Sequence, residues 1–187
     1  MDIYYQSDKF KQLLRRYEEL QEDNISEFLD PEELTDVAEY YHYIGEDNKA
    51  LEAVDYAIHM YPTATIPLSF KARLALFCND DPQLADEIAE MIVDKTDLDY
   101  LYLKAEIMIV DNKAAEADDF LQSQYDEIIS QEDREDYVLD VAALFSDYEE
   151  TEFVEKWLSR STKTGDNDYK ELRARVLKNH GKYKESE

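Results

Sequence analysis

Apolar residues recur at intervals of three and four residues in the segment 30–62, first over positions 34–41 and again over positions 50–58. The pattern is carried by Leu34, Val37, Ala38 and Tyr41 in the first stretch and by Ala50, Leu51, Val54, Ala57 and Ile58 in the second. This interval places the apolar residues on one face of an α-helix. The segment therefore predicts two amphipathic helices.

Turn and capping residues delimit these two helices. Asp30 is a typical N-cap, Pro31 suits the first helical position, and Glu33 stands where a capping box requires it. Gly45 is expected to end the first helix, because glycine adopts the left-handed conformation without a steric cost. Pro62 is expected to end the second helix, so the pattern predicts a helical hairpin.

Small side chains return at a regular interval along the chain. Alanine recurs with gaps of 34, 33, 37 and 32 residues, at Ala38, Ala72, Ala105, Ala142 and Ala174. A period near 34 residues is typical of stacked helical hairpins. Three departures from the pattern of the segment 30–62 are expected: a turn at 79–82 with one extra residue, Asn112 in place of glycine, and a long loop near 128–132. Gly181 is expected to begin the turn of a fifth unit.

The segment 30–62 resembles one tetratricopeptide repeat. The order and spacing of its marked positions match that family, with Leu34 and Val54 in place of the usual aromatic residues. The resemblance is weaker in the later units and covers roughly residues 30–183. It implies an all-α fold, a right-handed α-α superhelix of stacked antiparallel helical hairpins, in which the first helices line a concave face.

This interpretation divides the chain into an N-terminal amphipathic helix within 1–29 and about four and a half repeats. The repeats are expected at 30–64, 65–96, 97–130, 131–164 and, incompletely, 165–187. The N-terminal helix is predicted to begin at the cap Ser7 and to cover the open side of the first repeat. Its basic residues form either a solvated face, or a docking site or latch: Lys9, Lys11, Arg15 and Arg16. The basic last helix is either a cap or the start of a hairpin in a longer array.

The net charge narrows the choice of partner. The 187 residues carry a formal net charge of −26, from 46 acidic and 20 basic side chains. Such a field repels phosphate groups, so binding to nucleic acid or to an anionic membrane is not expected, whereas a cationic partner is attracted. The same charge also suits a solvated surface that keeps the molecule soluble. Since no apolar run has the length of a membrane span and no signal peptide is found, a cytoplasmic protein is predicted.

Catalytic and metal-binding patterns are not found in the sequence. The three histidines, His42, His59 and His180, fall in different predicted helices, and none has a second histidine at metal-ligand spacing. There is no Gly-rich phosphate loop and no nucleophile elbow. Cys78 has no second cysteine to pair with, and its apolar neighbours predict a buried thiol. The sequence therefore predicts a protein without enzymatic activity, cofactor or metal.

The resemblance places a candidate binding surface on the first helices of the hairpins. Carried over by motif, this surface consists of Thr35, Glu39, His42, Tyr43, Ser69, Arg73, Phe77, Asp99, Tyr102 and Glu106, with Leu139 and Ala143 in the fourth unit. The clamp by which some family members hold acidic C-terminal peptides is missing, because Glu39 and Glu106 occupy positions where it needs asparagine or basic residues. A segment with Lys or Arg and an apolar anchor is complementary to these charges and rings. Packing between repeats is the alternative role for any one of these side chains.

Two functions follow from these patterns as alternatives. In the first, the chain is a non-catalytic scaffold that binds a peptide or protein segment, with basic segments favoured, in an acidic and aromatic concave groove. In the second, the chain is a structural or assembly module that self-associates or forms part of a longer solenoid. The sequence identifies neither the partner nor the oligomeric state.

Overall fold

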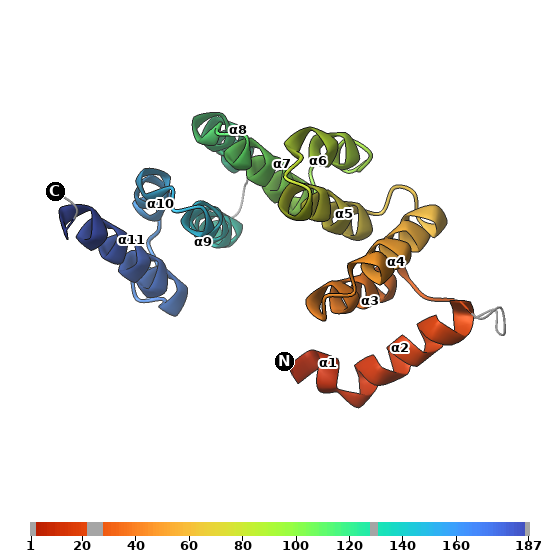
Figure 1. Cartoon of the computed structure of the whole chain (residues 1–187). Helices are drawn as coiled ribbons and strands as arrows, with labels where there is room; N and C mark the ends of the chain where they lie inside the picture. Colours follow the sequence, from red (N-terminus) through yellow and green to blue (C-terminus); the bar gives the residue numbers. More distant parts are fainter. Residues whose placement is uncertain (1–2, 22–27, 128–130, 186–187) are drawn as a thin grey trace. The chain divides into compact units, whose positions relative to one another are not determined.

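A computed structural model describes residues 3–21, 28–127 and 131–185 of the chain (Figure 1). Within these residues the secondary structure is entirely helical, and no strand is present. The all-α class predicted from the apolar periodicity is therefore confirmed. The chain divides into two compact units, Met1–Leu103 and Lys104–Glu187.

The helices follow one another with short connections. The first unit contains α1 (Ile3–Gln6), α2 (Asp8–Gln21), α3 (Pro31–Tyr43), α4 (Asp47–Met60), α5 (Thr65–Cys78), α6 (Pro82–Ala89) and the start of α7 (Leu98–Val110). The second unit contains the rest of α7, then α8 (Ala114–Glu127), α9 (Gln131–Asp147), α10 (Thr151–Leu158) and α11 (Asn167–Glu185). Each predicted repeat range holds one pair of helices, except that the last range holds α11 alone.

Local capping sets where the first helices begin. The Ser7 hydroxyl accepts a hydrogen bond from the Phe10 amide at 3.1 Å, which confirms the predicted cap of α2. At α3, Asp30 accepts from the Glu33 amide at 2.8 Å, and the Asp30 amide donates to the Glu33 carboxylate at 3.1 Å. This reciprocal pair is the predicted capping box. The short helix α1, which lies before Ser7, was not expected from the sequence.

Four hairpin turns share one backbone geometry. Each has three residues between its helices, and the middle residue has a positive φ: 79° at Gly45, 53° at Asp80, 59° at Asn112 and 58° at Glu149. Gly45, Asn112 and Glu149 each follow the repeat alanine by seven residues, whereas Asp80 follows Ala72 by eight. The extra residue expected in the second repeat therefore lies in α5 and not in the turn.

The hydrogen bonds of these turns explain why the helices end there. The Gly45 amide donates to the His42 carbonyl at 2.9 Å, and the Glu46 amide donates to the Tyr41 carbonyl at 2.8 Å. This is the Schellman pattern, and it recurs at Asn112 and Glu149. Two carbonyl groups that the helix leaves unpaired are satisfied in this way.

The repeated alanines are buried in the first four repeats but not in the fifth. Ala38, Ala72 and Ala105 are completely buried, and so is Ala142. Ala174 is exposed, so the expectation that it packs like the others is wrong. Helix α11 instead buries the face that carries Leu172 and Val176.

Three further expectations are corrected by the structure. Helix α11 continues through Gly181, so the turn predicted there does not form. Gln131 and Glu132 belong to α9, so they are not part of a loop, and 128–130 lie outside the described residues. Cys78 is exposed because it is the last residue of α5, beyond the buried segment that ends at Leu76.

Within each unit a hairpin packs against the helix that follows it. In the first unit α3 and α4 pack together, α5 packs against both of them, and α6 packs against α5 (Figure 1). In the second unit α9 and α10 pack together, and α11 packs against both. The helix that follows a hairpin therefore faces both of its members, which brings first helices such as α9 and α11 side by side.

Candidate functional site

The candidate surface on α3 is only partly accessible. Thr35 is buried, and its hydroxyl donates to the Pro31 carbonyl at 2.7 Å, so it does not line an open surface. Glu39, His42 and Tyr43 are exposed. The His42 Nδ1 atom lies 2.9 Å from an Asp47 carboxylate oxygen, a contact between the end of α3 and the start of α4.

Helix α5, like α3, has one buried candidate residue and others that are partly or fully accessible. Ser69 is buried, as Thr35 is, whereas Arg73 is half-buried and Phe77 is 55% exposed. Tyr43 is 52% exposed and stands at the same distance after its repeat alanine as Phe77 does. Because α3 and α5 pack together, they present aromatic rings at matching positions on neighbouring helices.

The electrostatics of this first surface are mixed. Although Glu39 as a whole residue is exposed, partial burial of its carboxyl group is the main cause that raises its pKa above the ordinary value, and repulsion from Asp36 adds to the effect. Arg73 opposes this shift by attracting the carboxylate, so the Glu39 and Arg73 side chains interact between α3 and α5. The Tyr43 ring also contacts the Tyr5 ring of α1, with centroids 5.4 Å apart.

The remaining candidates lie on α7. Asp99 is exposed, and Tyr102 and Glu106 are half-buried. Asp99 and Tyr102 belong to the first unit and Glu106 to the second. The ten residues selected from the sequence therefore do not form a site within one unit.

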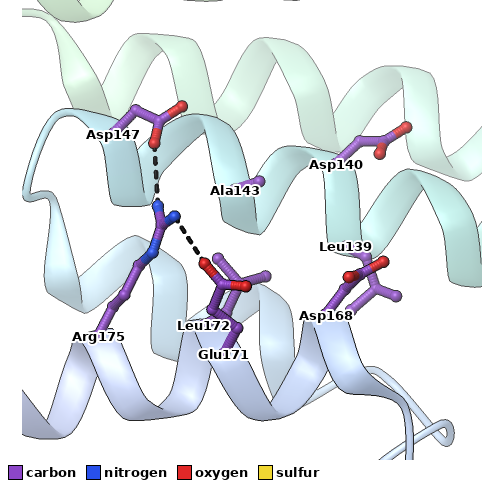
Figure 2. A pocket seen from close by; sticks show the side chains of 8 residues that line it. All are labelled: Leu139, Asp140, Ala143, Asp147, Asp168, Glu171, Leu172 and Arg175. Atoms are coloured by element: carbon purple, nitrogen blue, oxygen red, sulfur yellow. Dashed lines mark hydrogen bonds and ion pairs between the residues drawn. The ribbon is translucent and has the colours of Figure 1, made fainter. Parts of the chain in front are cut away.

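The second unit contains a cavity of about 260 Å³ between α9 and α11 (Figure 2). Its lining is Leu139, Asp140, Ala143 and Asp147 from α9, and Asp168, Glu171, Leu172 and Arg175 from α11. Leu139 and Ala143 are the two positions of the fourth repeat that the resemblance placed on the binding surface. The α11 side was missed, although Arg175 follows Ala174 as Arg73 follows Ala72.

One end of this cavity holds a guanidinium group. The Arg175 Nη1 atom donates to the Asp147 carboxylate of α9 at 3.1 Å, and its Nη2 atom donates to the Glu171 carboxylate at 2.9 Å. The hydrogen bond to Glu171 is the main cause that raises the pKa of Arg175 above its ordinary value. The guanidinium thus bridges one carboxylate from each helix (Figure 2).

The other end of the cavity has carboxylates on both helices. Asp140 precedes Asp147 by seven residues, and Asp168 precedes Arg175 by seven. Seven residues are about two helical turns, so the two ends are about 10 Å apart along the helices. Asp147 faces Arg175 at one end, and Asp140 of α9 and Asp168 of α11 line the cavity at the other end (Figure 2).

A second cavity, of about 300 Å³, lies between the N-terminal helices and α3. The Arg16 guanidinium pairs with the Glu33 carboxylate at 3.0 Å and donates to the Phe28 carbonyl at 3.2 Å. The Tyr4 hydroxyl donates to the Asp36 carboxylate in the same region. Arg16 of the basic cluster therefore connects α2 to α3 through Glu33, while Lys9 is exposed at the cavity.

Membrane spans and metal sites are both absent among the described residues. No helix there combines the length and the apolar composition that crossing a bilayer requires. In the same residues, no group of three or more His, Cys, Asp and Glu side chains is arranged to hold a metal ion. The cavity between α9 and α11 is thus the best-defined candidate, since it joins carboxylates from two helices to an apolar floor.

Comparison of this chain with protein-family models, with curated proteins and with solved structures finds no match.

Proposed function

We propose that this chain is a tetratricopeptide-like array that binds a basic peptide segment on the first helices of its hairpins, with the cavity between α9 and α11 of the second unit as the principal site. The array is supported by the recurrent three-residue turns, by the buried alanines and by the packing of each following helix against a hairpin. Such arrays present a surface to a partner rather than a catalytic centre. This architecture supports the proposal of a scaffold role.

The observation that carries the proposal is the composition of the cavity between α9 and α11. Four carboxylates and one guanidinium surround Leu139, Ala143 and Leu172. A lysine or arginine side chain suits this arrangement, because its hydrocarbon stem packs on apolar groups while its charged head reaches the carboxylates. Pockets for whole small molecules span about 300–1,000 Å³, so this smaller cavity suits a single side chain of a longer segment.

The first unit offers a surface of compatible chemistry. The exposed rings of Tyr43 and Phe77 can hold apolar side chains or stack with cations. The carboxyl group of Glu39 lies on the same helix as Tyr43. A segment that alternates basic and apolar residues is complementary to both surfaces, each considered within its own unit.

The test is a binding measurement with the full chain and three labelled peptides, by fluorescence anisotropy. One peptide carries Arg, Lys and Leu, the second has Gln at every basic position, and the third has Glu there. Only the first is expected to bind, and its affinity should fall as salt rises, because added ions screen the exposed charges.

A pair of variants shows whether the cavity is the binding site. Asp168→Asn removes one carboxylate from the cavity and is expected to weaken binding by up to about fivefold, the limit for an exposed ion pair. Asp119→Asn, on the exposed face of α8, makes the same change in charge away from the cavity and should leave the affinity unchanged. Equal losses in both variants would show that overall charge, and not this cavity, attracts the peptide.

The assembly module is the second candidate, and the exposed face of α11 favours it. Ala174 is exposed and Leu177 is 63% exposed, on a helix that buries its opposite side. A second copy of the chain could cover this face. Light scattering over a range of protein concentrations decides the matter, since a constant monomer mass contradicts self-association.

A further inference from the structure

We propose that Arg175 is an internal competitor for the arginine side chain of a bound segment. This inference rests on the proposed function, because it concerns the same cavity between α9 and α11. In the free protein the Arg175 guanidinium occupies the carboxylates of Asp147 and Glu171, and a ligand arginine takes its place when the segment binds. Arg175 thereby sets the threshold of affinity that a segment must exceed.

The chain itself shows which chemistry this end of the cavity accepts. Two different nitrogen atoms of one guanidinium reach two carboxylates, at 3.1 Å to Asp147 and 2.9 Å to Glu171. A planar guanidinium offers donors in a fixed fork, whereas a lysine ammonium is a single compact charge. The arrangement of the two carboxylates therefore favours arginine over lysine.

The internal guanidinium is held loosely enough to be displaced. The Arg175 side chain is 47% exposed, and those of Asp147 and Glu171 are 68% and 65% exposed. Water and salt screen an ion pair at this exposure, so the pair contributes little to stability. Exchange for a ligand guanidinium keeps both carboxylates hydrogen-bonded, and Arg175 is free to turn outward into solvent.

The charge pattern of the cavity explains the effect of removing this competitor. With Arg175 in place, its positive charge offsets part of the field of the four lining carboxylates. Without it, the Asp147 and Glu171 carboxylates are left for the ligand, and the field at the cavity becomes more negative. Both changes should strengthen the binding of an arginine-containing segment.

The experiment compares Arg175→Gln with Arg173→Gln in the full chain. Both variants remove one positive charge from α11, but Arg173 pairs with Glu155 of α10 at 3.6 Å and does not line the cavity. We expect Arg175→Gln to bind an Arg- and Leu-containing peptide about two- to fivefold more tightly than the unmodified chain, the range of an exposed ion pair. We expect Arg173→Gln to bind it as the unmodified chain does.

A second peptide and a second variant test whether the cavity prefers arginine to lysine. When Lys replaces Arg in the peptide, the gain from Arg175→Gln should be smaller, because one ammonium does not bridge both carboxylates as a guanidinium does. Arg175→Lys keeps the charge but gives up the fork, so it should bind the Arg peptide with intermediate affinity. Circular dichroism of each variant checks that the helices are intact.

The outcomes separate this inference from the proposed function. If the unmodified chain binds the basic peptide, and Arg175→Gln weakens binding or equals Arg173→Gln, the competitor role is overturned while the binding function stands. Equal gains for the Arg and Lys peptides would overturn the preference for arginine. If neither the unmodified chain nor Arg175→Gln binds any basic peptide, the proposed function itself fails.

Discussion

The carboxylate of Asp118 in α8 accepts a hydrogen bond from the indole Nε1 of Trp157 in α10, at 2.8 Å. Trp157 is completely buried and Asp118 is 3% exposed. The Lys156 ammonium pairs with the same carboxylate, so the buried charge is compensated. One carboxylate thus joins the second helix of one predicted hairpin to the second helix of the next.

Replacement of Asp118 by alanine is expected to destabilise the second unit. The buried indole N–H would lose its acceptor, which costs about 1–3 kcal/mol of unfolding free energy. Urea denaturation followed by Trp157 fluorescence measures this loss. Asp119→Ala changes the neighbouring exposed carboxylate and should stay within about 0.5 kcal/mol of the unmodified chain. A loss of the same size in both would contradict a specific role for the Asp118–Trp157 hydrogen bond.

The repeat alanines allow one substitution to be compared at two sites. Ala38→Leu adds a large side chain at a completely buried position of α3, and overpacking of this kind typically costs about 1–3 kcal/mol. Ala174→Leu makes the same change at an exposed position of α11 and should stay within about 0.5 kcal/mol. Chemical denaturation measures both variants. A large loss at Ala174 would mean that this face of α11 is covered after all.

Glycine substitutions should have opposite signs at two turns predicted from the sequence. Gly45 has a φ of +79°, and a Cβ atom there meets nothing within 4 Å, so Gly45→Ala introduces backbone strain alone and should cost about 1–2 kcal/mol. Gly181 lies inside α11, so Gly181→Ala should stabilise by about 0.5–1 kcal/mol. Urea denaturation midpoints show whether each variant is more or less stable than the unmodified chain. If Gly181→Ala were destabilising, Gly181 would lie in a turn, as the sequence predicts, and not inside a helix.

The raised pKa of Glu39 predicts a pH-dependent stability. The folded chain holds this proton to a higher pH than the unfolded chain does, so the ionised group destabilises the fold as pH rises through the raised pKa. Glu39→Gln should therefore raise the melting temperature near neutral pH. The difference should vanish below the ordinary value of 4.5, where the carboxyl group is protonated in both states.

Thermal melts followed by circular dichroism at several pH values measure this difference. Glu52→Gln, an exposed change on α4, is the matched control and should show little pH-dependent gain. If the stabilisation by Glu39→Gln persisted unchanged in acid, the pKa of Glu39 would not be its cause.

Features that depend on neighbouring residues were predicted well. The Ser7 cap, the capping box of Asp30 and Glu33, and the left-handed residue Gly45 all formed as expected. Each depends on hydrogen bonds or dihedral angles within a few residues, which the local sequence specifies. Glu149 shows the limit of this rule, because glutamate rarely adopts the positive φ that the turn requires there, whereas aspartate, as at Asp80, adopts it more readily.

The candidate site was predicted only in part. Leu139 and Ala143 do line the cavity, but their partners on α11 were not selected, and Ser69 and Thr35 are buried. The repeat register indicates which helix face a residue occupies. It does not indicate how deeply the next helix covers that face, since this depends on the side chains of both helices.

The starts of α2 and α3, the end of α3 at Gly45 and the period of the small residues were determined by the sequence alone, because capping, turn dihedrals and apolar spacing act over short distances. Tertiary structure decided which of these positions is buried. Ala38 and Ala174 hold the same place in the repeat, yet only Ala38 is buried. It also decided that Asp147 and Arg175 meet across the cavity, because an ion pair between two helices exists only where packing brings both side chains within reach.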